Sequence, residues 1–177
     1  MELKEILTMV REKYPNIDGV MMKPADLVFE ERVKMGCFNC GKYYSNWKCP
    51  GNMPNNIDYQ KLVNEYDKGA FIYLKLPVNE TNYNDIRIDS SIILHKAILE
   101  IEKILWNSNC SIVTSFIGGS CKLCKNGCGI EKCNNPYISR SPLESIGVNV
   151  IRSVEKYGID IVFPPKEYII RVGLVLW

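Results

Sequence analysis

Hydrophobic side chains recur at helical spacing in three segments of the chain. Over residues 1–14 and 86–107, apolar positions repeat every three or four residues, which predicts two helices that each bury one face. Residues 57–68 show the same pattern more briefly, and Gly69 marks the expected end of that helix. Segment 86–107 carries the longest stripe of Ile and Leu, so we expect it to form the main helix of the fold.

A fourth helix is expected over residues 141–157, because its first residues form a helix-start signal. Ser141 suits the N-cap, Pro142 suits the first helical position, and Glu144 completes a capping box. Gly158 then predicts the end of this helix, since glycine readily adopts the left-handed conformation common there.

Short apolar runs bounded by Gly, Pro and polar residues predict β-strands. The expected strands are 19–22, 27–29, 70–77, 111–117, 159–163 and 168–177. Helices alternate with these strands along the chain, an order typical of helices packed on a sheet. The pattern therefore predicts an α/β (α+β) sandwich in one domain, residues 1–177, with one mixed β-sheet and helices packed on it.

Two segments rich in Cys interrupt this regular pattern. Residues 34–56 (the first Cys segment) and 120–140 (the second Cys segment) combine Cys, Gly and Asn without periodicity, so we expect both to be loops. Neither contains enough apolar residues to bury a core of its own. Each therefore needs a bound metal, or contact with the other segment, to offset the entropy lost on ordering.

The eight Cys accompany a single His in a chain of 177 residues. Lys and Arg total 22 against 20 Asp and Glu, so the charge gives no reason to expect nucleic-acid binding. No signal peptide is recognisable at the start, and no apolar run is long enough to span a membrane. We therefore expect a reduced, cytoplasmic protein without a membrane partner, in which closely spaced Cys ligate metal rather than form disulfides.

The Cys residues that we expect to bind metal fall into two clusters. The first contains Cys37, Cys40 and Cys49, and the second contains Cys121, Cys124, Cys128 and Cys133. Thiolate ligands without nearby His suit either zinc or an iron–sulfur cluster. The crowding of the second cluster is closer to the tight wrapping of ferredoxin loops than to two separated zinc knuckles. The spacing therefore favours one or two iron–sulfur clusters of the 4Fe–4S type, with zinc as the alternative.

The first cluster is one ligand short of a four-Cys site. Cys110 could complete it, Cys128 or Cys133 could do so from the second cluster, or an iron position could stay open to a small ligand and make the protein an enzyme. Cys110 stands about 23 Å before residue 117 at the rise of a strand, so we expect it to be a buried structural thiol outside the second cluster.

Other side chains near the clusters each have two possible roles. Tyr43, Tyr44 and Trp47 could pack over the metal site, or they could wall a pocket for a planar ligand. His95 lies beside the apolar stripe of the expected long helix, a position typical of a surface or boundary residue rather than of a ligand.

Five motifs together resemble an uncharacterised prokaryotic family of predicted metal-binding proteins, common in anaerobic bacteria and methanogenic archaea. The motifs are Cys37-Phe38-Asn39-Cys40-Gly41-Lys42-Tyr43, Trp47-Lys48-Cys49-Pro50, Gly118-Gly119-Ser120-Cys121-Lys122-Leu123-Cys124, Cys133 with Pro136 three residues later, and Ser141-Pro142-Leu143-Glu144-Ser145-Ile146-Gly147-Val148. The resemblance implies metal binding through these Cys, as an iron–sulfur centre, and it implies no particular activity.

These observations lead to two functional hypotheses from different classes. In the first, the protein carries out redox chemistry on an iron–sulfur cluster near its surface, as an electron-transfer protein or a small reductase. It calls for a redox partner protein or a small-molecule substrate, and the sequence identifies neither. The second is a zinc-binding structural or interaction module. The sequence leaves the oligomeric state open, as well as whether the protein is an enzyme.

Overall fold

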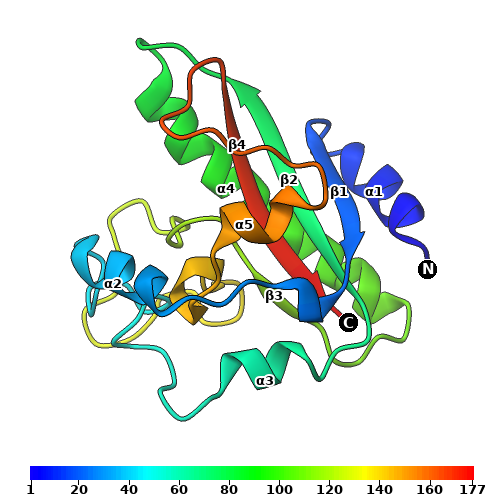
Figure 1. Ribbon diagram of the computed structural model, residues 1–177, viewed down its shortest axis with the longest axis horizontal. Coiled ribbons are helices and arrows are strands. Elements are labelled where there is room, and N and C mark those ends of the chain that lie inside the picture. The colour runs from blue at the N-terminus through cyan, green and yellow to red at the C-terminus, as the bar shows by residue number, and fades with distance from the viewer.

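Four strands form a single sheet in the computed structural model, which describes residues 1–177 (Figure 1). The strands are β1 (Ile17–Met22), β2 (Gly69–Pro77), β3 (Thr114–Phe116) and β4 (Tyr168–Leu176). Their order across the sheet is β1-β2-β4-β3, and every neighbouring pair is antiparallel. The predicted fold class is therefore confirmed, although the sheet is antiparallel throughout rather than mixed. The reason is that β4 inserts between β2 and β3, which run in the same direction but do not touch.

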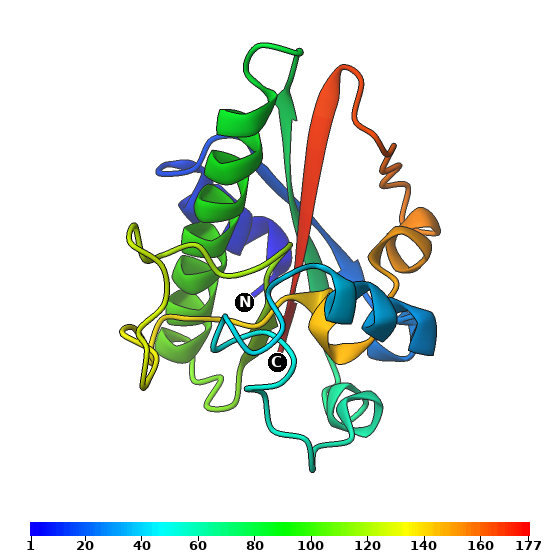
Figure 2. The same cartoon turned by 90° about the vertical axis from the view of Figure 1, so that its left-hand side faces the viewer.

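Helices cover both faces of this sheet (Figure 2). They are α1 (Leu3–Arg11), α2 (Glu31–Asn39), α3 (Tyr59–Val63), α4 (Tyr83–Asn107) and α5 (Val150–Glu155), with short 3-10 turns η1 (Pro24–Asp26) and η2 (Leu143–Ile146). Helices α1 and α4 pack on one face, and η2 and α5 pack on the other. None of the helices is both long and apolar enough to cross a membrane.

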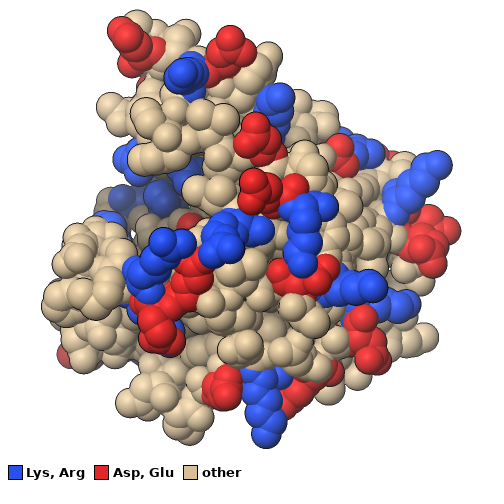
Figure 3. Space-filling model, in the orientation of Figure 1, with Lys and Arg blue, Asp and Glu red and all other residues tan.

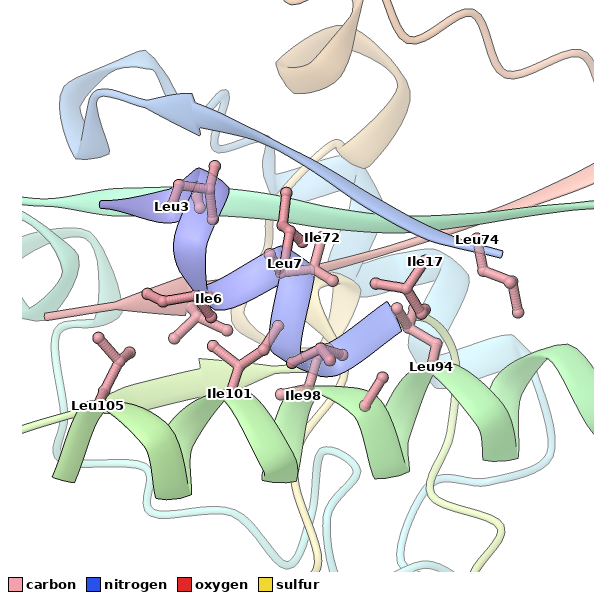
Figure 4. Close-up of a cluster of buried hydrophobic side chains, with 14 of the residues drawn as sticks. Leu3, Ile6, Leu7, Ile17, Ile72, Leu74, Leu94, Ile98, Ile101 and Leu105 are labelled. Atoms are coloured by element: carbon pink, nitrogen blue, oxygen red, sulfur yellow. The ribbon is translucent and has the colours of Figure 1, made fainter. Parts of the chain in front are cut away.

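The core between the sheet and α4 follows directly from the periodicity of the chain (Figure 4). Ala70, Ile72 and Leu74 alternate along β2 and point toward the apolar stripes of α1 and α4, where they are almost fully buried. Gly173 on β4 allows α4 to approach closely, because a Cβ there would lie 2.4 Å from Cδ1 of Ile98. The predicted amphipathic helices 1–14 and 86–107 are confirmed, with slightly different ends.

A second core lies on the opposite face of the sheet. Phe71 and Leu174 point to this side and pack against apolar residues of η2 and α5, among them Leu143, Ile146 and Val154. The chain that follows the second Cys segment therefore returns to the sheet and helps to cover it. The two faces together explain why β2 is apolar at nearly every position of its first half.

The single helix expected over residues 141–157 is wrong. The structure contains η2 and α5 instead, separated at Gly147, whose φ of 91° ends the first turn. Pro142 rather than Ser141 occupies the N-cap, so the expected capping box does not form. The sequence signal for a helix start was real, but glycine six residues later interrupts the helix.

Two expected strands also differ in the structure. Residues 159–163 do not join the sheet, because Ile159 packs into the second core beside α5 rather than pairing with a strand. Residues 27–29 form only one isolated bridge, between Phe29 and Val148. Both segments are apolar because they cover the sheet, and burial of this kind does not require a strand.

Candidate metal centre

The first Cys segment begins in a helix, contrary to the expectation of a loop throughout. Cys37 lies in the last turn of α2, and Cys40 forms the C-cap of that helix. The sequence does not predict this helix, because none of its residues is buried and it therefore has no apolar periodicity. After α2 the chain continues through turns to Cys49, which is only 4% exposed.

A network around Glu30 holds the start of α2 in place. Its carboxylate accepts hydrogen bonds from Arg32, from Nδ2 of Asn149 at 3.1 Å and from Nη1 of Arg152 at 2.7 Å. These donors, Arg32 first among them, lower the pKa of Glu30 to about 2. The Glu30 amide also donates to the carbonyl of Gly147 at 2.9 Å. The helix is thus attached to the turn that follows η2.

The second Cys segment begins at two glycines that the local geometry requires. Gly118 lies against β4, where a Cβ would come within 2.6 Å of the Val172 carbonyl oxygen. Gly119 has a φ of 76°, in the left-handed region that favours glycine. The chain thereby leaves the sheet sharply and enters the Cys-rich turns.

The far end of the second Cys segment is fixed to α4 by buried polar contacts. Arg140 forms a bidentate ion pair with Glu102, in which Nε lies 2.7 Å from Oε1 and Nη2 lies 2.5 Å from Oε2. Ser115 also donates to Glu102. Nε2 of His95 lies 2.9 Å from the carbonyl oxygen of Ile138. His95 is fully buried, so the surface or boundary position expected for it is wrong.

Two hydrogen bonds join the Cys segments to each other, and the segments lie side by side in Figure 2. Nε1 of Trp47 donates to the carbonyl oxygen of Gly129 at 2.7 Å. Nδ2 of Asn46 donates to the carbonyl oxygen of Cys121 at 3.1 Å. Contact between the segments, which the sequence suggested as one way to order them, is therefore present.

A cavity of about 1110 Å³ lies between the two segments, α2 and the first turns of α4. Figure 3 shows this face hollowed, with Lys and Arg atoms inside the hollow. Six thiols contribute to its lining: Cys37, Cys40, Cys49, Cys121, Cys124 and Cys128. The fold thus brings six of the seven predicted ligands to one cavity.

Cys133 and Cys110 lie outside this lining. The thiol of Cys133 is 3.4 Å from Oγ of Ser139, within the second Cys segment. Cys110 lines a separate hollow next to Trp106 and packs, half-buried, against the α1–α4 core. The expectation that Cys110 is kept away from the second cluster agrees with this placement, although its side chain is less buried than expected.

Burial governs the chemistry of the thiols. Loss of solvent raises the pKa of Cys37 to about 11 and that of Cys49 to about 12, and it also raises the pKa of Cys121. For Cys49 the neighbouring Cys40, Cys37 and Cys128 add to this effect. Cys37, Cys49 and Cys121 are therefore neutral at pH 7, and a metal would have to displace their protons.

In this arrangement no three His, Cys, Asp or Glu side chains converge closely enough to bind one metal ion. Metal ligands commonly reach their final geometry only as the metal binds, because the binding free energy also orders the chain around them. The donor set itself suits a soft metal, since thiols dominate the lining and no His is among the lining residues.

Charged residues that sequence analysis did not single out also line the cavity. Arg87 comes from α4, Lys122 from the second Cys segment and Arg171 from β4. Burial lowers the pKa of both Lys122 and Arg171. Glu144, which the sequence assigned to a capping box, instead lines the cavity, and burial raises its pKa. Lys122 and Glu144 lie within motifs that resemble the family, but only the fold shows that they meet Arg87 and Arg171 at one cavity.

The aromatic residues do not wall the cavity. Tyr43 packs edge-to-face against both Phe38 and Tyr44, with ring centres 5.2 and 4.9 Å apart, and neither tyrosine is a lining residue. Trp47 donates a hydrogen bond to the carbonyl oxygen of Gly129 and is not a lining residue either. The hypothesis of an aromatic pocket wall is therefore wrong, and packing around the first Cys segment is their role.

The fold and this cavity define an α+β protein in which six thiols line one cavity beside an antiparallel sheet. Residues 20–177 match the family model described as Predicted metal-binding protein (DUF2284), and the chain belongs to this family. The resemblance inferred from the motifs is thereby confirmed. No curated protein and no solved structure matches the chain.

Proposed function

We propose that the protein binds an iron–sulfur cluster in the Cys-lined cavity and uses it for redox chemistry. The observation that carries this proposal is the gathering of six thiols from two distant segments around one cavity, without His. Thiolates alone are the usual ligands of 4Fe–4S clusters. When bound, such a cluster would supply one-electron transfer.

The placement of the thiols suggests how a four-Cys set is completed. Cys37, Cys40 and Cys49 come from the first Cys segment, and both Cys121 and Cys128 share the cavity with them. Cys128 and Cys121 also lie close enough to raise the pKa of Cys49 electrostatically. We therefore assign the fourth ligand to the second Cys segment and not to Cys110. A role for Cys133 as a ligand stays a prediction.

The surroundings of the thiols fit a role in redox chemistry. The cavity lies at the molecular surface, so an electron partner or a small molecule can reach it (Figure 3). The Lys and Arg side chains of its lining offset the negative charge that thiolate ligands would gather there. Electron transfer to a partner protein and reduction of a small molecule are both compatible with this geometry.

Anaerobic purification followed by visible spectroscopy, with iron, sulfide and zinc analysis, tests the proposal. We expect broad visible absorbance with matching iron and sulfide, and reversible bleaching by dithionite. Cys49→Ser should lose this absorbance, whereas the matched variant Cys110→Ser should retain it. A colourless protein that contains stoichiometric zinc would overturn the proposal in favour of a structural zinc module. Retention of the full spectrum in Cys49→Ser would overturn the ligand assignment.

A further inference from the structure

One wall of the Cys-lined cavity is strongly cationic. Five Lys and Arg residues contribute to the lining: Lys42, Arg87, Lys122, Lys125 and Arg171. Glu144 is the one acidic residue among them. None of the five cations belongs to any of the ion pairs of the protein, which instead join residues on the surface or at the Glu102–Arg140 contact. The fold therefore concentrates five positive groups around one carboxyl group, Glu144, and no direct ion pair neutralises any of them.

Two of these cations face the same point in space. Nη1 of Arg171 lies 3.7 Å, and Nζ of Lys122 lies 3.8 Å, from the position that a Cβ on Gly119 would occupy. No other heavy atom outside the neighbouring residues comes within 4 Å of that position. Because residue 119 is glycine, the space between the two cations stays free of side chain.

Neutral groups hold these cations in position. Arg171 donates from Nε to Oγ of Ser90 at 3.3 Å and from Nη2 to the carbonyl oxygen of Arg87 at 3.2 Å, whereas Nη1 has no partner in the protein. Lys122 donates from Nζ to the carbonyl oxygen of Ser120 at 2.9 Å. These contacts orient the positive groups without neutralising them, which is the arrangement expected of a site built for an anion.

We propose that this wall binds a small molecule through an oxyanion group, a carboxylate or a phosphate, held by Arg171, Lys122 and Arg87. Arginine presents paired donors that match the oxygens of either group, and lysine adds a compact charge. Glu144 forms no ion pair with these cations, although Arg171 and Lys122 lie near enough to lower its pKa against the effect of burial, and its buried Oε2 has no hydrogen-bond partner. A ligand with a hydroxyl group beside its oxyanion would supply the missing donor to Glu144.

The oxyanion site adjoins the thiols along the chain itself. Gly119, Ser120, Cys121 and Lys122 are consecutive, and all of them line the cavity. A ligand held by Lys122 and Arg171 therefore lies next to the proposed cluster. Its role as the substrate of that cluster rests on the proposed function, whereas the binding of the anion does not.

Calorimetric titration with inorganic phosphate and, separately, with succinate tests the anion site at low salt. Both the metal-free and the metal-loaded wild-type protein are titrated, and the stronger of the two probes identifies the oxyanion as phosphate or carboxylate. We expect saturable binding of at least one probe. Arg87→Gln and Arg171→Lys should each weaken it about tenfold, because each removes charge-assisted hydrogen bonds. Arg171→Lys keeps the charge, so it also tests the need for the guanidinium.

Arg11→Gln is the matched control, because it removes one arginine charge on α1, outside the cavity. Its affinity should stay within about twofold of that of the wild type. Three results would overturn the inference: no saturable binding of either probe, equal weakening by Arg11→Gln, or an unchanged affinity in both Arg87→Gln and Arg171→Lys. If phosphate binds but no iron is found, the anion site stands and the proposed function fails.

Discussion

The core between the sheet and the helices α1 and α4, and the Cys segments that are attached to α4, are built on different principles. Between the sheet and the two helices, Ile and Leu side chains at regular spacing are almost completely buried. The Cys segments contain little regular structure beyond α2, and hydrogen bonds and ion pairs at a few points hold them. The first region is stabilised by apolar burial spread over many residues, and the second by a small number of specific contacts.

The difference in packing determines where a functional site can lie in this fold. A tightly packed core leaves no room for a ligand and tolerates few polar groups. The Cys segments, in contrast, leave a cavity open among thiols and cations. Burial alone does not offset the conformational entropy that these segments lose when they become ordered. The core thus serves as the rigid support, and the segments mounted on it form the site.

The contact between the two regions should be the most sensitive point. Arg140→Met leaves the carboxylate of Glu102, which is 2% exposed, without its ion-pair partner. We expect the free energy of unfolding to fall by about 4 kcal/mol, because a buried charge is left uncompensated. Urea denaturation measures the change. Lys34→Met, which breaks an ion pair between side chains that are 54% and 88% exposed, is the control and should change the stability little. Equal losses in the two variants would mean that the buried ion pair does not join the regions.

Truncation of a side chain in the α1–α4 core should lower the free energy of unfolding nearly as much. It tests whether close packing of this core stabilises the protein. Ile98→Ala removes a fully buried side chain that packs over Gly173. The expected loss of unfolding free energy is about 3 kcal/mol, from lost burial and the cavity left behind. Ile112→Ala, at a side chain that is 72% exposed, should change the unfolding midpoint little. If the two variants melt alike, the assignment of Ile98 to the core is wrong.

Acid should weaken the attachment of the second Cys segment through His95. Burial lowers the pKa of His95 from 6.5 to about 4, with Glu102, Arg140 and Lys122 as the charged neighbours. The unfolded chain therefore binds a proton between these values while the folded chain does not, so stability falls as the pH drops from 6.5 toward 4. The contribution is about 3 kcal/mol. The difference between wild type and His95→Gln, followed by denaturation across this range, measures it. A pH-independent difference would contradict the prediction.

The smallest effect should come from the hydrogen bond that joins the two Cys segments. Trp47→Phe removes the Nε1 donor to the carbonyl oxygen of Gly129 and keeps most of the aromatic packing. We expect a loss of about 1 kcal/mol, confined to the Cys segments. Amide hydrogen exchange should accelerate in residues 120–140 but not in α4. Trp106→Phe, whose side chain is 48% exposed, serves as the control. Faster exchange across α4 as well would show that the two regions are not separable.

Sequence reasoning succeeded where burial imposes a period on the chain and failed where it does not. The stripes of residues 1–14 and 86–107 became α1 and α4, and the apolar run 70–77 became β2. Helix α2 was missed because it buries no residue. The apolar pattern of residues 159–163 predicts a strand that does not form, because apolar segments that cover a sheet have the same composition as segments within it.

The main helices, the central strands, the fold class and the Cys residues that are candidate ligands can be predicted from the sequence. They depend on local spacing, which is readable along the chain. The cavity that six Cys share cannot be predicted in this way, and neither can the position of Arg87, Lys122 and Arg171 beside them. Glu144, which the sequence places in a helix cap, also lines that cavity. These residues come from α2, α4, β4, η2 and both Cys segments, and no local pattern along the chain records which distant side chains the packed sheet will bring together.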